Sequence, residues 1–197
     1  MARPTPAQII ALHKRLEVIH DCEFVSKSDS RWMDLAGKGL AVLGIQTEEE
    51  FEGYTTTIGR TIFIAYEIGV ESPGYPLEWQ AKVAIHETVH VGQWRRGGWV
   101  GFGLGYLVNK LELARWEGQA YASEYDIEYW RTGAVPELSQ NMDQLYHYGL
   151  DGGHVAVAHT ISKQLGLAVA NDVPSSPEAA IGVQVLQEIM PEWRQAA

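Results

Sequence analysis

One short motif constrains the fold of this chain more than any other feature: a histidine, a glutamate and a second histidine at positions 86, 87 and 90. The surrounding segment, Leu77 to Arg95, has the composition of a helix, and two glycines follow it. Residues four apart on a helix share a face, so the imidazoles of His86 and His90 can reach one metal ion. The pattern therefore predicts a long helix that carries two metal ligands, with Glu87 next to the ion.

The composition of the chain limits which residues can bind a metal and which partners the protein can have. The single cysteine, Cys22, excludes an intrachain disulfide framework and a cysteine-based zinc site, and we expect Cys22 itself to be inert. A tight metal site must then use histidine and carboxylate. The net charge of −10 argues against a nucleic-acid partner. Neither a signal peptide nor an apolar run of about 18 residues is visible, so no membrane span is expected. A cytoplasmic location is the default, and signal-less export or incorporation in a particle stays open.

Hydrophobic periodicity predicts a helix-rich α+β chain with a small sheet ahead of the motif helix. β-branched and aromatic residues at 54–58 and 61–66, separated by Gly59 and Arg60, predict a β-hairpin. Glycines in the connector at 97–106 fit a mobile flap over the site or a buried turn, and we prefer the turn. Apart from the motif helix, helices are expected over residues 5–20, 30–43, 108–131, 136–148, 154–167 and 177–193.

The length of 197 residues suits a single domain over residues 1–197. We expect a core of about residues 51–150 to hold the motif. Residues 1–50 and 151–197 would then be helical extensions at the two ends.

The identity of the third ligand is the main open question of the site. Catalytic zinc sites usually have three protein ligands and one open position for water. No third histidine follows His90 at the spacing of the longer motif, so a carboxylate on a following helix is expected. The candidates are Glu112, Glu117 and Glu124. Glu117 is favoured because the small residues Gly118 and Ala120 would let its helix approach the motif helix closely.

His86-Glu87-x-x-His90 followed by Glu117-x-x-Ala120-Tyr121 resembles the gluzincins, zincin-type HExxH zinc metallopeptidases, in their small single-domain bacterial and phage forms. The resemblance covers roughly residues 60–131. It implies a Zn²⁺ ion held by His86, His90 and Glu117, and a substrate along an edge strand ahead of the motif helix, here residues 61–66.

Two positions depart from the family pattern. Gln119 stands where a glutamate is common. Tyr121 stands where many gluzincins have an aspartate that orients a ligand histidine, and such partners fix the tautomer and orientation of the ring.

These residues predict a zinc-dependent metallohydrolase, a peptidase acting on a peptide or protein substrate. Glu87 would deprotonate a metal-bound water and pass the proton to the leaving amine. Tyr148 and His154 are candidates for hydrogen-bonding the oxyanion of the tetrahedral intermediate. Two alternatives stay open: a non-catalytic, zinc-stabilised module of a larger protein assembly, and a zinc amidase acting on a non-peptide substrate such as a cell-wall cross-link. Glu87 favours an enzyme, because a structural site has no need of a glutamate beside its first histidine.

Overall fold

The structure is a computed structural model of the chain, and it describes residues 2–30, 53–136, 145–146 and 149–195. This described part is rich in helix and contains one three-stranded sheet, which confirms the expected α+β class. The helices predicted at 30–43 and 136–148 lie almost entirely outside the described residues. Within the described part, no helix has both the length and the apolar character needed to cross a membrane.

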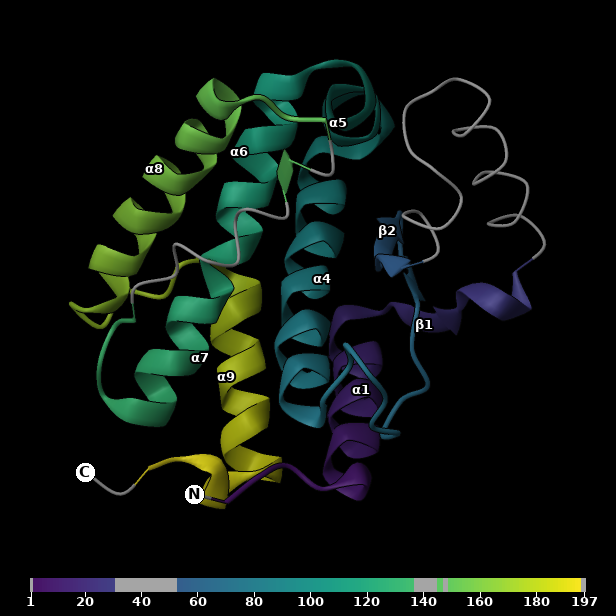
Figure 1. Cartoon of the computed structure of the whole chain (residues 1–197), viewed down its shortest axis with the longest axis vertical. Coiled ribbons are helices and arrows are strands. Elements are labelled where there is room, and N and C mark those ends of the chain that lie inside the picture. Colours follow the sequence, from purple (N-terminus) through teal and green to yellow (C-terminus); the bar gives the residue numbers. More distant parts are fainter. Residues whose placement is uncertain (1, 31–52, 137–144, 147–148, 196–197) are drawn as a thin grey trace.

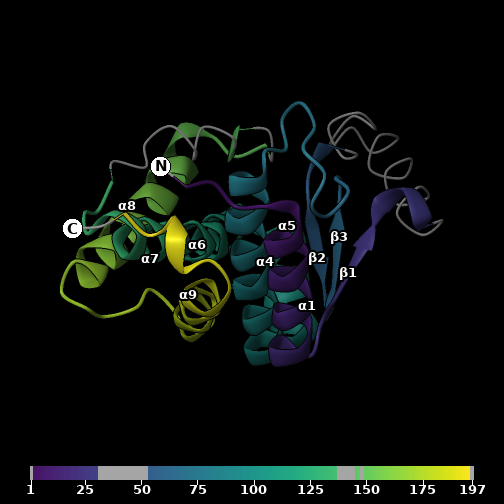
Figure 2. The same cartoon turned by 90° about the horizontal axis from the view of Figure 1, so that it is seen from below.

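Helix α4, Leu77–Gly98, is the central element and carries the motif, as predicted. The sheet lies on one side of it, and helices from the C-terminal half of the chain cover the other (Figures 1 and 2). Helices α1, Pro6–His20, and α9, Pro177–Ile189, pack against α4 in one hydrophobic core that includes Ile9, Leu12, Ile85 and Leu186. The two terminal helices, expected as extensions, therefore share their core with the motif helix.

The ends of these helices follow local signals in the sequence. The Thr5 hydroxyl caps α1 by accepting a hydrogen bond from the Gln8 amide at 3.3 Å, and the Gln8 side chain accepts one from the Thr5 amide at 2.9 Å. Ser176 caps α9, with Pro177 at its first position. Such caps satisfy backbone N–H groups that have no partner inside the helix.

The helix predicted over 108–131 is two helices, α6, Lys110–Tyr121, and α7, Ser123–Thr132. The Ser123 hydroxyl donates to the Ala120 carbonyl at 2.7 Å where the two meet, so a side chain competes there for a carbonyl of the helix. Gly133 ends α7 with a φ of 73°, which a residue with a side chain rarely adopts.

Helix α6 packs on α4 and, over a longer stretch, on α8, Gly152–Val169. The expectation that Gly118 lets α6 approach the motif helix was wrong. A Cβ atom at Gly118 would lie 2.7 Å from the carbonyl oxygen of Ala158, which belongs to α8. The missing side chain therefore permits the close approach of α6 to α8.

The sheet has strand order β1-β3-β2, formed by Glu23–Ser26, Thr61–Ile64 and Thr56–Ile58 respectively. β2 and β3 form the predicted antiparallel hairpin around Gly59, whose φ is 66°. β1 was not predicted, and it pairs with β3 in parallel. Because β3 has a neighbour on both sides, residues 61–64 are not the edge strand expected to take the substrate. Among the described residues, the outer strand on the side of the hairpin is β2.

The connector after α4 is helical, which the sequence did not predict. It consists of a π-helical segment, η2, Trp99–Leu104, and a short helix, α5, Gly105–Val108. Phe102 is buried, and its ring lies 5.5 Å from that of Trp116 and 5.8 Å from that of Trp94. Trp99 is 56% exposed. The connector is thus helical and not the preferred buried turn: Phe102 is buried, but Trp99 and Val100 face outward.

Candidate metal centre

His86 and His90 lie one turn apart on α4, and Glu117 reaches them from α6. The Nε2 atoms of the two histidines are 3.2 Å apart. One carboxylate oxygen of Glu117 lies 3.7 Å from His86 Nε2, and the other lies 3.6 Å from His90 Nε2. With one ligand atom taken from each residue, all three atoms lie within 4.8 Å of one another. Two nitrogen donors and one carboxylate thus converge on one point between two packed helices.

This geometry fits a metal ion. A zinc ion holds its nitrogen and oxygen ligands at about 2.0–2.2 Å, so neighbouring ligand atoms around a tetrahedral ion are about 3.4 Å apart. The two histidine nitrogens are 3.2 Å apart, and each lies 3.6–3.7 Å from a different oxygen of Glu117, so the separations are close to that value. His86, His90 and Glu117 can therefore hold a metal ion.

Burial favours the protonation state of His86 that binds a metal. Burial, together with the neighbouring His90, lowers the pKa of His86 well below its usual range. His86 is therefore neutral at physiological pH, and a neutral imidazole is the form that offers a lone pair to a metal.

Glu87 is close to this cluster but is not one of its members. Its side chain is buried, and its Oε2 atom accepts a hydrogen bond from the Thr57 hydroxyl of β2 at 2.6 Å. Burial raises the pKa of Glu87, and the charge of Glu117 raises it further. His90 and the hydrogen bond from Thr57 lower this pKa and offset part of the rise. A carboxyl group with a raised pKa is suited to exchanging protons near neutral pH.

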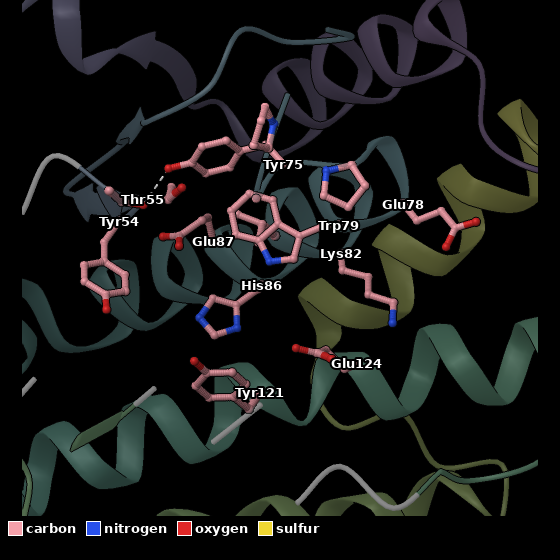
Figure 3. A pocket seen from close by; sticks show the side chains of 15 residues that line it. Tyr54, Thr55, Tyr75, Glu78, Trp79, Lys82, His86, Glu87, Tyr121 and Glu124 are labelled. Carbon is pink, nitrogen blue, oxygen red and sulfur yellow. Dashed lines mark hydrogen bonds between the residues drawn. The ribbon is translucent and has the colours of Figure 1, made fainter. Parts of the chain in front are cut away.

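A cavity of about 490 Å³ opens beside His86 and Glu87 (Figure 3). Its volume is in the range of small-ligand sites. Figure 3 shows the His86 ring between the Glu87 carboxyl group and the Tyr121 ring. The wall combines aromatic rings with charged groups: Tyr54, Tyr75, Trp79 and Tyr121, and Glu78, Lys82 and Glu124. A molecule in this cavity would have access to both the candidate metal position and the Glu87 carboxyl group.

Tyr121 occupies the position where the family resemblance suggested an aspartate. Its ring packs edge-on against the His86 ring, with centroids 4.8 Å apart and an angle of 75° between the planes. Burial and the carboxylates of Glu117 and Glu124 raise the pKa of Tyr121 well above its usual range. The phenol therefore keeps its proton and can donate a hydrogen bond in the cavity.

The other candidates for the third ligand lie elsewhere. Glu112 pairs with Arg115 one turn along α6, at 2.6 Å. Glu124 is on α7 and lines the cavity, but it is not part of the cluster. Among the three candidate glutamates, the structure brings Glu117 to the histidines.

The two oxyanion candidates are not both described. Tyr148 lies outside the described residues. His154 is in the first turn of α8, where its Nδ1 atom lies 2.7 Å from Asp151 Oδ1, and it is not among the residues that line the cavity.

Two polar partners of the site were missed by the sequence analysis: Thr57, which binds Glu87, and Gln93, whose Oε1 atom lies 2.7 Å from Nδ1 of His90. A usable signal existed for Gln93, because residues three apart on a helix are neighbours and Gln93 follows His90 by three. No local signal connects Thr57 with Glu87, since they are 30 residues apart.

The chain was compared with protein-family models, with curated proteins and with solved structures, and none of these matched it.

Proposed function

We propose that this protein is a zinc-dependent hydrolase of the zincin type that cleaves peptide bonds. His86, His90 and Glu117 would hold the zinc ion, and Glu87 would act as general base and acid. A bound zinc ion polarises a water molecule and a substrate carbonyl group at neutral pH. Two histidines and a carboxylate, with one position left open, form a donor set typical of catalytic zinc.

The observation that carries the proposal is the position of Glu87. Its buried carboxyl group lies outside the ligand cluster, is fixed by Thr57 and lines the same cavity as His86. A site that only stabilises the fold requires the three ligands but neither this carboxyl group nor an adjoining cavity.

The Glu87 carboxylate would carry out both proton transfers of the reaction. One oxygen is engaged by the Thr57 hydroxyl, and the other is left to accept the proton of the attacking water. As the C–N bond breaks, the same carboxyl group returns that proton to the leaving amine, which completes the hydrolysis and regenerates the carboxylate. The neutral phenol of Tyr121 would donate a hydrogen bond to the carbonyl oxygen as it gains negative charge.

The proposed path of the substrate runs past β2. Tyr54 and Thr55 line the cavity immediately before this strand, and Thr57 within it holds Glu87. An extended peptide beside β2 would place its backbone next to the candidate metal position, in the manner of a strand added to a sheet edge.

Glu87→Gln tests the proposal. It keeps the size of the side chain and an oxygen that can accept from Thr57, but it removes the base. We expect unchanged zinc content and a loss of about 10²–10⁴ in the rate of hydrolysis, measured with a peptide library. Glu112→Gln on α6 is the matched control and should cleave at the wild-type rate.

An undiminished rate in Glu87→Gln would contradict the mechanism. Zinc binding without hydrolysis of any peptide in the wild type would favour the non-catalytic module. Cleavage confined to non-peptide amides would favour the amidase.

A further inference from the structure

Gln93 makes more contacts with the candidate centre than a helix-packing residue requires. It is on α4 one turn beyond His90, and its side chain is fully buried. Its Oε1 atom lies 2.7 Å from His90 Nδ1. Its Nε2 atom lies 3.0 Å from the backbone carbonyl oxygen of Trp116 and 3.3 Å from Gln119 Oε1. One buried amide group thus connects a ligand histidine on α4 to the helix that carries Glu117.

The Trp116 carbonyl determines which way round the amide group lies. A backbone carbonyl oxygen can only accept a hydrogen bond, so the group 3.0 Å from it must be the NH₂ of Gln93. The amide oxygen of Gln93 must then face His90. Because that oxygen can only accept, His90 Nδ1 must carry a proton.

The proton on Nδ1 settles the state of the other ring nitrogen. In a neutral imidazole one nitrogen carries the proton and the other has a free lone pair. When His90 is neutral, its lone pair is therefore on Nε2, the atom that lies 3.2 Å from His86 Nε2 and 3.6 Å from a Glu117 oxygen. With His90 in this neutral form, the hydrogen bond between the two Nε2 atoms must be donated by His86. The two ligand histidines accordingly hold opposite tautomers before a metal binds.

We propose that Gln93 is a positioning residue that locks His90 as the Nδ1–H tautomer, with its Nε2 lone pair directed at the metal position. The inference rests on the proposed metal-binding role of His86, His90 and Glu117. Gln93 takes its own orientation from Trp116, the residue before Glu117, so the same turn of α6 supplies the third ligand and orients the second. A hydrogen bond to the remote nitrogen of a ligand histidine typically changes metal affinity 10–100-fold when it is removed.

The first test needs no substitution and no metal. Two-bond ¹H–¹⁵N correlation spectra of the metal-free, ¹⁵N-histidine-labelled protein at about pH 8, where an ordinary histidine is neutral, distinguish the two tautomers. We expect His90 to be protonated at Nδ1 and His86 at Nε2. A His90 protonated at Nε2 would overturn the inference, whether or not the protein proves to bind zinc.

The second test compares two substitutions at Gln93. Gln93→Leu removes the acceptor, so His90 should lose its preference for Nδ1–H and zinc affinity should fall 10–100-fold in a competition titration with a coloured chelator. Gln93→Glu keeps an acceptor for Nδ1–H but cannot donate to Trp116. It should preserve the tautomer, so it also serves if the leucine variant does not fold.

Gln80 provides a matched control on the same helix. It too is fully buried, and its amide group contacts the backbone of Gly69, Val70 and Tyr75 at 2.8–3.1 Å, away from the ligands. Gln80→Leu should lower the unfolding temperature without changing the zinc affinity of the folded protein. If Gln93→Leu behaves like Gln80→Leu, with the tautomer and the zinc affinity unchanged, Gln93 only joins two helices. If no variant and no wild-type protein binds zinc, the proposed function fails, while the tautomer measurement still decides the role of Gln93.

Discussion

Replacing Gly118 by alanine tests whether the packing of α6 on α8 sets the position of Glu117. A Cβ atom at this position would lie 2.7 Å from the Ala158 carbonyl oxygen, 3.0 Å from its Cα and 3.2 Å from its carbonyl carbon. All three are backbone atoms of a helix, so none can rotate aside. The helices would have to separate by about 0.7 Å before the first contact reached the 3.4 Å of ordinary van der Waals packing.

Gly118→Ala should lower both the stability of the protein and its affinity for zinc. Overpacking of a core typically costs about 1–3 kcal/mol, and alanine regains up to about 1 kcal/mol of helix propensity over glycine. We therefore expect a net loss of up to about 2 kcal/mol in the free energy of unfolding. Metal–ligand distances tolerate about 0.2 Å, which is less than the required displacement of the turn that carries Glu117. Zinc affinity should fall by about tenfold or more.

Urea unfolding of the metal-free proteins and a zinc competition titration measure the two effects separately. Gly166→Ala is the control, since a Cβ atom there would lie 2.9 Å from three ring atoms of Tyr125, at the contact of α8 with α7. It should lose stability and keep its zinc affinity. If Gly118→Ala binds zinc as tightly as the wild type, the packing of α6 on α8 does not position Glu117.

Three further substitutions have defined outcomes. Thr57→Val removes the hydrogen bond that favours the ionised form of Glu87, so the acid limb of the pH–rate profile should move to higher pH; an unchanged limb would contradict this role. Tyr121→Phe should keep zinc bound and lower kcat by about 10²–10³, whereas a fall confined to zinc affinity would limit Tyr121 to holding His86. His13 is buried against Tyr66, and burial lowers its pKa to about 4, below the value of about 6.5 in an unfolded chain. Stability should therefore decrease as the pH falls from 6.5 to 4, by up to about 3 kcal/mol, and urea midpoints of His13→Gln over this range should lack that part of the decrease.

Local signals were sufficient for most of the described helices and for the hairpin. Thr5 with Pro6 marked the start of α1, Pro177 marked that of α9, and Gly133 marked the end of α7. Gly59 marked the turn between β2 and β3. Each of these features depends on residues close together in the chain, which is why the sequence alone predicted them.

Features that depend on distant residues were not predictable in the same way. β1 has only four residues, and its pairing with β3 joins Glu23 to Thr61. Without that pairing, β3 had to be taken for an edge strand. The space around Gly118 is filled by Ala158, which is 40 positions further along the chain. Gly118 was therefore expected to permit the packing of α6 on α4, whereas it permits the packing of α6 on α8.

In the candidate site, too, the local features were predictable from the sequence and the contacts between distant residues were not. The spacing of His86 and His90 placed both on one face of α4. A carboxylate on a later helix was expected, and Glu117 was chosen among three because of Gly118 and Ala120, although Gly118 faces α8. The partners of the site depend on tertiary structure: Thr57 reaches Glu87 from the sheet, and the Trp116 carbonyl orients Gln93 from α6. Neither partner belongs to a recognisable motif.

The most direct test of the central claim is the zinc content and zinc coordination of the protein purified without a histidine tag and without added metal. Elemental analysis combined with X-ray absorption at the zinc edge should find about one zinc per chain, with two imidazole nitrogens and carboxylate or water oxygens at about 2.0–2.2 Å. Glu117→Ala should lose most of this zinc, and Glu112→Ala should retain it. Zinc far below one per chain that dialysis against zinc does not restore, or equal zinc in the two variants, would contradict a metal centre formed by His86, His90 and Glu117.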